Sequence, residues 1–439
     1  MKKLMIAFIA LIGLGFASCE VEEVLNPNSP TVESFENGAT LADLQLLGQG
    51  LQSVIRDDME FHFWTVSILG REYYDLRGTD PRYTSELLGQ NGGSLDNNGF
   101  ITTRSYFGRH RSVRNANLLK TAVQNASATL SPGEVNSFLG FANTITGYEM
   151  LLEANRQFEN GLRLDTADPI NLGPFAPDYN STLEGIKAVL DEGYGQLTNA
   201  SANFLFELGD GMFSTIPGYD DSQTAAVAQF NRGILARLEI LRGNKAEAAT
   251  ALGDSFMDMA GDMNAGGYYA FGGNTGNDRG NPLFFVPGVD NYMAHPTWIA
   301  DATAGDARLS KATQATLIEL DGLSGDHQVT VYSSNTDPAS IQRNEELILI
   351  MAEARIGGNN AGAVEAINVV RKAAGLADYS GGMSDAELED ELLYQRRYSL
   401  FAEGHRWIDL RRYGRLSEIP TDRAGDVVHV QFPRPASEN

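Results

Sequence analysis

Apolar side chains recur every three to four positions along most of the chain, which is the spacing of one face of an α-helix. The first such stretch is Leu41 to Ile55, and the same period returns at residues 134–158, 181–200, 222–242, 344–356, 361–374 and 384–410. The last stretch begins with Ser384 and has Glu387 three residues later, a pairing typical of a capping box. The hydrophobic pattern therefore predicts a mainly α-helical protein.

Two of the predicted helices end in a Gly-Asn pair and are followed by an alanine-rich helix. These junctions lie at residues 241–244 (LRGN) and 356–359 (IGGN). Gly-Asn suits the left-handed turn that ends a helix, and alanines let two antiparallel helices approach closely. The pattern is similar to the tetratricopeptide helix pair, although two independent αα-hairpins would show the same spacing.

The helical period fades between residues 257 and 340 and again between residues 70 and 108. Aromatic residues stand there among Gly, Asn, Pro and Asp. We interpret both stretches as long loops with short strands, and long ordered loops commonly carry function. We therefore expect residues 41–439 to form a single helical domain with loop-rich insertions at about 60–110 and 257–340.

The N-terminus has the pattern of a bacterial lipoprotein signal peptide. A basic start precedes an apolar run from Leu4 to Phe16, and small residues lead to Cys19, the only cysteine. The pattern predicts a cleaved peptide over 1–18 and a lipidated Cys19 that begins an acidic tether over 19–40. An ordinary secretory peptide is the alternative. The acidic residues after Cys19 resemble the surface-export signal of Bacteroidetes-type lipoproteins, or form a solvated linker.

Charge and motif content narrow the function classes. The net charge of −24 excludes general nucleic-acid binding, because such a surface repels phosphate backbones. The six histidines lack metal-ligand spacing, so we expect no metal or other cofactor, although the Asn/Asp-rich residues 274–281 leave Ca²⁺ open. No GxSxG or SxxK motif occurs either, so the sequence gives no support to nucleophilic catalysis.

Several stretches resemble the SusD/RagB family of outer-membrane nutrient-binding lipoproteins. LNPNSP at residues 25–30 is similar to the family's start after the lipid anchor, and MAEA at 351–354 is similar to a family helix ending in AEA. RRYSLFAEGHRWIDLRR at 396–412 is similar to the family form ER..EL..EG.R..DL.R, with Gln395 where the glutamate usually stands. The resemblance covers the tether and the C-terminal part well, and the middle in general layout.

The resemblance implies a superhelix of tetratricopeptide-like helix pairs and a loop-rich region that presents the ligand. It implies a lipid-anchored place at the cell outer membrane and a SusC-like TonB-dependent transporter as the partner. The protein would capture oligosaccharides and deliver them without any enzymatic step. The resemblance also implies that four residues of the last motif tie helices together, namely Glu403, Arg406, Asp409 and Arg412.

Aromatic residues of the two loop regions are the candidate ligand contacts. Sugar rings stack their C–H faces on aromatic planes, while nearby Asp, Asn and Arg bind the hydroxyls. Tyr73 and Tyr74 are favoured because adjacent strand residues face opposite sides, so both cannot enter one core. For each aromatic alone, a place in the core is the alternative. The predicted contacts are Trp64, Tyr73, Tyr74, Asp75, Tyr292 and Trp298.

Other functions stay open on the sequence alone. The same scaffold would also suit peptides or another nutrient. A lipid-anchored glycoside hydrolase would need a pair of carboxylates in a cleft, which sequence spacing does not reveal. A helical-repeat scaffold that binds only proteins in the periplasm is the remaining alternative.

Overall fold

The computed structural model describes residues 35, 38–168, 170–272 and 279–438. The predicted signal peptide, Cys19 and nearly all of the tether lie outside the described residues, as does most of the Asn/Asp-rich stretch at 274–281. Within the described ranges, no helix combines the length and the apolar character that a membrane crossing requires.

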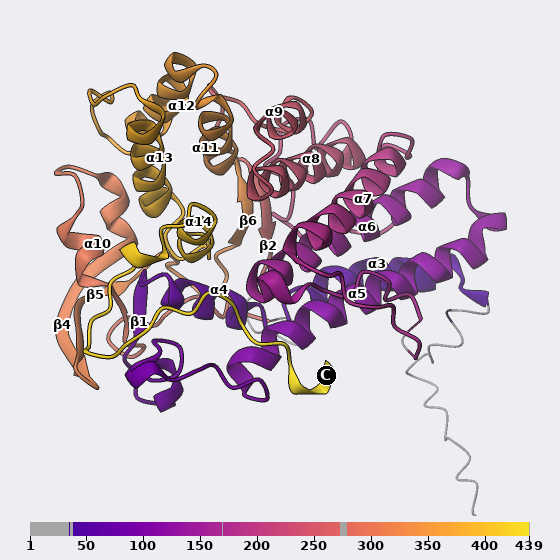
Figure 1. Cartoon of the computed structure of the whole chain (residues 1–439). Helices are drawn as coiled ribbons and strands as arrows, with labels where there is room; N and C mark the ends of the chain where they lie inside the picture. The colour runs from indigo at the N-terminus through magenta and orange to yellow at the C-terminus, as the bar shows by residue number, and fades with distance from the viewer. Residues whose placement is uncertain (1–34, 36–37, 169, 273–278, 439) are drawn as a thin grey trace, which may run out of the picture.

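Helices that follow one another along the chain pack side by side and form an arc-shaped scaffold (Figure 1). The Gly-Asn junctions join α8 to α9 and α11 to α12, and Gly243 and Gly357 adopt the left-handed φ values of +77° and +89° that such turns need. The predicted mainly α, helix-pair fold is confirmed. The scaffold consists of α3 (Leu41–Val54), α5 (Phe100–Ala126), α6 (Pro132–Gln157), α7 (Tyr179–Leu197), α8 (Gln223–Leu241), α9 (Lys245–Gly253), α11 (Asn344–Arg355), α12 (Asn360–Ala373) and α13 (Asp385–Ser399).

A small antiparallel sheet lies at one end of the arc and belongs to the loop-rich region (Figure 1). Its strand order is β1-β3-β5-β4, so segments far apart in sequence become neighbours, and a second pair of strands, β2 and β6, lies between the helices. The elements are α4 (Met59–Leu69), β1 (Tyr73–Asp75), β2 (Gly266–Tyr269), β3 (Tyr292–Ala294), α10 (Pro296–Ala300), β4 (Ala312–Leu320), β5 (Leu323–Val329) and β6 (Ala339–Arg343).

Two expectations about the helices were wrong. The insertion predicted at 60–110 is not loop throughout, because α4 and the start of α5 lie within it. Helix α4 is buried on nearly all sides and the first turns of α5 mix polar with apolar residues, so neither shows a single apolar stripe. The helix predicted over 384–410 breaks after α13. Ala402 and Gly404 take φ values of +64° and +74°, which a helix cannot include, and α14 (Arg406–Arg412) starts anew.

The chain beyond α14 returns to the scaffold and fastens it. The Phe432 amide donates to the Arg156 carbonyl at 2.9 Å, and the Ala436 amide donates to the Asn97 carbonyl at 2.9 Å. The Phe432 ring is fully buried beneath the guanidinium of Arg156, whose carbon lies 3.8 Å from the ring centroid. The C-terminal segment therefore holds the loop region and the helix scaffold together.

Candidate ligand-binding surface

Strand pairing brings together four of the residues that the sequence analysis selected. β1 and β3 are antiparallel, with Asp75 opposite Tyr292. The Tyr292 ring lies 5.6 Å from the ring of Trp64 and 5.9 Å from the ring of Tyr73. Tyr292 stands more than two hundred positions after the other three residues along the chain, and the pairing of β3 with β1 brings it to them.

Arg77 completes this group, and sequence reasoning missed it. Its Nε and Nη2 donate to the two carboxylate oxygens of Asp75 at 3.0 and 2.7 Å. Held in this way, the guanidinium lies over the rings of Tyr292 and Trp64, with its carbon 4.4 and 5.5 Å from the centroids. Arg77 and Trp64 are half-buried, so the group reaches the surface through a flat cation and an indole.

Two further aromatic side chains and two further arginines extend this group outward. The Phe61 ring contacts the rings of Trp64 and Phe100 at 5.6 and 5.8 Å. Arg82 lies 4.2 Å over Phe100, Arg104 lies 4.9 Å over Phe61, and their side chains are 41% and 55% exposed. We call the whole set the arginine–aromatic cluster: Phe61, Trp64, Tyr73, Asp75, Arg77, Arg82, Phe100, Arg104 and Tyr292.

A short sequence pattern fixes the orientation of the Arg77 and Arg82 side chains. In Asp75-Leu76-Arg77 and Asp80-Pro81-Arg82 the aspartate accepts both the backbone amide of the arginine and its guanidinium. The pattern returns at Asp306 and Arg308, where the guanidinium lies 5.6 Å from the ring of Tyr398. Repeated Asp-x-Arg in an aromatic loop is thus the signal from which Arg77 and Arg82 were predictable.

Two polar atoms of the cluster are buried without a hydrogen-bond partner among the described residues. They are the Tyr292 hydroxyl and the Trp64 indole nitrogen Nε1. Burial, reinforced by the charge of Asp75, raises the pKa of Tyr292, so its phenol keeps its proton and stays a donor. Burial also raises the pKa of Glu60, one helical turn before Trp64.

The other predicted contacts are built into the core. The Tyr74 ring contacts the His295 ring in a tilted arrangement at 5.2 Å, and Trp298 stacks on Phe401 at 4.2 Å. The inference that one tyrosine of the pair must be exposed was wrong, because both sides of β1 are covered: Tyr73 is 1% exposed and Tyr74 2%. Asp75, Tyr292 and Trp298 are buried as well, which leaves Trp64 as the accessible ring among the six.

The arginine-rich motif around α14 joins several elements. Asp409 accepts from Arg396 of α13 at 2.7 Å and from Arg412 at 2.9 Å. Arg412 also pairs with Glu353 of α11, while Glu403 accepts from Arg343 of β6 at 2.6 Å. Burial alone would raise the pKa of Asp409, but Arg396 and Arg412 lower it to about 2. Arg406 differs, since within the described ranges it donates only to the Gly70 carbonyl, at 3.1 Å.

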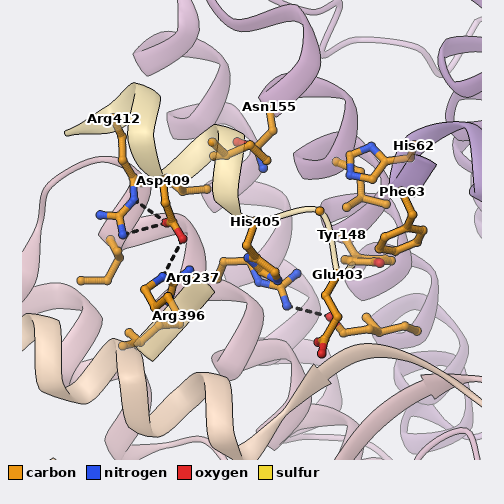
Figure 2. A pocket seen from close by; sticks show the side chains of 17 residues that line it. His62, Phe63, Tyr148, Asn155, Arg237, Arg396, Glu403, His405, Asp409 and Arg412 are labelled. Atoms are coloured by element: carbon orange, nitrogen blue, oxygen red, sulfur yellow. Dashed lines mark hydrogen bonds and ion pairs between the residues drawn. The ribbon is translucent and has the colours of Figure 1, made fainter. Parts of the chain in front are cut away.

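Figure 2 shows a small polar cavity beside this motif, lined by His62 of α4 and by Glu403 and His405 of the segment between α13 and α14. Its volume is about 30 Å³, which holds one or two water molecules. Burial lowers the pKa of His405 to about 4 and that of His62 well below its usual range, so both rings are neutral. A sugar does not fit, and the cavity is structural.

Metal binding finds no support in the part of the chain that the structure describes. No group of three or more His, Cys, Asp or Glu side chains lies close enough there to hold an ion.

Residues 299–435 match the model of the SusD family. A SusD superfamily protein from Bacteroides vulgatus has 17% identity and a TM-score of 0.66, with 91% of this chain and 96% of that chain covered. A SusD homolog from Bacteroides thetaiotaomicron has 15% identity and a TM-score of 0.66, with coverage of 94% and 97%.

A third solved structure is described as a laminarin-binding SusD-like protein. It is 16% identical, with a TM-score of 0.59 and coverage of 89% of this chain and 96% of that one. None of the curated proteins matched the chain. The matches define a helical protein with the SusD-type scaffold. The family model itself matches the part of the chain that contains α14 and most of the C-terminal segment.

Proposed function

We propose that the protein captures glycans at the cell surface without cleaving them. The observation that carries the proposal is the SusD-type fold, which the chain shares almost end to end with a protein described as laminarin-binding. Glycan recognition on such a fold needs an aromatic plane and hydrogen-bonding groups at the surface. The arginine–aromatic cluster offers both, through Trp64 and the charged guanidinium groups of Arg77, Arg82 and Arg104.

The cluster supports binding rather than hydrolysis. Glycosidases use two carboxyl groups on either side of the scissile bond, and one of them must be free to move a proton. Asp75 is 3% exposed and has both carboxylate oxygens occupied by Arg77. Its carboxylate therefore orients the guanidinium of Arg77 and is poorly placed to act as an acid or a nucleophile.

The place of action and the partner also belong to this proposal. A lipidated Cys19 would hold the chain on the outer membrane, and an acidic tether over 20–40 would let it reach a neighbouring protein. The family resemblance makes that neighbour a SusC-like TonB-dependent transporter. Co-purification of such a barrel with the lipidated chain from native membranes, and its loss in Cys19→Ser, is the expected result.

The capture of glycans is tested with the lipid-free chain from Glu20 onward. Affinity electrophoresis against a panel of polysaccharides that includes laminarin, and calorimetry with oligosaccharides of any that retard the chain, should show binding. Assays for new reducing ends should show none. Retention of peptides with no glycan bound would contradict the proposal in favour of another nutrient, and release of sugars at enzyme-like rates would contradict it in favour of a hydrolase.

A further inference from the structure

A second concave site lies apart from the arginine–aromatic cluster, between α10, α13, α14 and the segment that follows α14. It is a groove of about 340 Å³, within the range of small-molecule sites. Leu393, Leu410 and Pro420 supply apolar walls. Although the protein is strongly acidic, three arginines line this groove: Arg397, Arg406 and Arg415.

Two of the three arginines are neutralised by carboxylates at the rim. Arg397 donates through Nη1 to Asp301 at 2.8 Å and through Nη2 to Thr297 at 2.9 Å. Arg415 donates to Asp390 and to Glu418, each at 2.6 Å. The three carboxylate side chains are 48% to 63% exposed, whereas Arg397 is only 10% exposed. The carboxylates thus lie at the exposed rim of the groove, whereas the Arg397 guanidinium lies inside it.

Arg406 has no carboxylate within ion-pair distance among the described residues. Its Nε donates to the Gly70 carbonyl at 3.1 Å, and its Nη1 and Nη2 have no hydrogen-bond partner in the described chain. Burial, and then the like charge of Arg397, lowers the pKa of Arg406 to about 10. The nearby carboxylates of Glu72 and Asp301 offset this charge only in part, because neither forms an ion pair with Arg406. A partly compensated charge of this kind costs free energy until an anion relieves it.

Arg411, also on α14, shows that not every arginine of this helix has unpaired guanidinium nitrogens. Arg411 also lacks a carboxylate, but its Nη1 and Nη2 donate to the carbonyls of Val430 and Asn155 at 3.0 and 2.7 Å. The rings of Phe158 and Trp407 cover it at 4.1 and 4.5 Å. Arg411 is thus fully accommodated by the protein, whereas the fork of Arg406 is left for something that enters the groove.

We propose that this groove binds an oxyanion, a carboxylate or phosphate group, on the guanidinium fork of Arg406 with Arg397 beside it. Guanidinium binds such groups with two parallel hydrogen bonds, which a lysine cannot do. The carboxylates at the rim repel a densely charged polymer. The groove therefore selects a small ligand with one anionic group, such as an acidic sugar or a free anion. The inference does not depend on glycan capture at the arginine–aromatic cluster.

Calorimetry with the lipid-free chain tests this directly. Glucuronate, inorganic phosphate and neutral glucose are titrated at one ionic strength set by chloride. Glucuronate should bind at least about tenfold more tightly than glucose, because only the acid pairs with the fork. Arg406→Gln should abolish that difference and Arg406→Lys should reduce it. Arg371→Gln, which removes an arginine paired with Glu391 outside the groove, should leave it unchanged.

The outcomes separate the sources of the oxyanion. Equal binding of phosphate and glucuronate identifies a free-anion site, and a preference for glucuronate identifies the sugar acid. If neither anion binds, or if Arg406→Gln binds as wild type does, the proposal is overturned.

A measurement on the wild-type chain covers the case in which Arg406→Gln fails to fold. Phenylglyoxal modification read by peptide mass spectrometry should show Arg406 protected by glucuronate and not by glucose, with Arg371 as the internal reference. Equal modification of Arg406 with and without glucuronate would overturn the proposal by this route.

Discussion

Asp75 and Arg77 show at the residue scale how a local pair becomes part of a surface. The aspartate accepts from the backbone and from the guanidinium of the same arginine, so the cation is fixed over Tyr292 and Trp64. An arginine that is aimed in this way loses little side-chain entropy when a ligand binds. Pre-organisation is therefore encoded within three residues of sequence.

Buried and exposed ion pairs of the α14 region predict different stabilities. Arg412→Ala removes the only ion-pair partner of Glu353 among the described residues and leaves Asp409 with Arg396 alone, and both carboxylates are almost fully buried. We expect a loss of about 3–5 kcal/mol in the free energy of unfolding, measured with urea. Arg415→Ala, which breaks pairs with the exposed Asp390 and Glu418, should cost less than about 1 kcal/mol. Equal losses would contradict a buried network.

His405 predicts a weakness in mild acid. Burial lowers the pKa of this ring to about 4 in the folded chain, while the unfolded value is about 6.5. Between these values only the unfolded chain takes up the proton, so the free energy of unfolding falls as the pH drops. From pH 7.5 to pH 5 this residue should account for a loss of about 2 kcal/mol.

The matched variants isolate that contribution. Urea unfolding at both pH values should show a smaller acid loss, by about 2 kcal/mol, in His405→Asn than in wild type. His327→Asn, on strand β5, serves as the control and should follow the wild type. An unchanged loss in His405→Asn would mean that the folded chain admits the proton.

At the scale of elements, close approach of α6 to α7 depends on glycine. A methyl group at Gly140 would lie 2.6 Å from Leu197 Cγ and 3.0 Å from the Gly193 carbonyl oxygen. We therefore expect Gly140→Ala to destabilise the chain by about 1–3 kcal/mol in thermal or urea unfolding. Gly195→Ala meets open space on the exposed side of α7 and should stabilise by up to about 1 kcal/mol. Stabilisation by both would show that the helices are farther apart.

Elements also show what the sequence could and could not predict. Helices with one buried face, such as α3, α7 and α12, follow from apolar spacing, and the box at Ser384 and Glu387 forms as expected. Helix α4 could not be predicted from apolar spacing, because nine of its residues are buried and no single apolar stripe distinguishes one face. The arginine–aromatic cluster depends on the pairing of β1 with β3, which no local pattern encodes.

The whole molecule combines a helix scaffold with a small, irregular region that carries most of the arginine–aromatic cluster. One core fills most of the helix arc, a second lies under the sheet, α14 and the C-terminal segment, and a third lies between α11, α12 and α13. Trp64 packs partly against the first two cores. Its indole is therefore supported by the scaffold on one side and borders the loops on the other, as a fixed contact for ligand would require.

Glycan affinity of cluster variants is the most direct test of this account. The glycan that binds the wild-type chain best is titrated into Trp64→Ala and Arg77→Gln, with Phe107→Ala as the control because Phe107 is an exposed ring outside the cluster. We predict at least about tenfold weaker binding for both cluster variants, about 1.4 kcal/mol each, with unchanged affinity for Phe107→Ala. Wild-type affinity in Trp64→Ala and Arg77→Gln, with melting temperatures that confirm folded proteins, would contradict it.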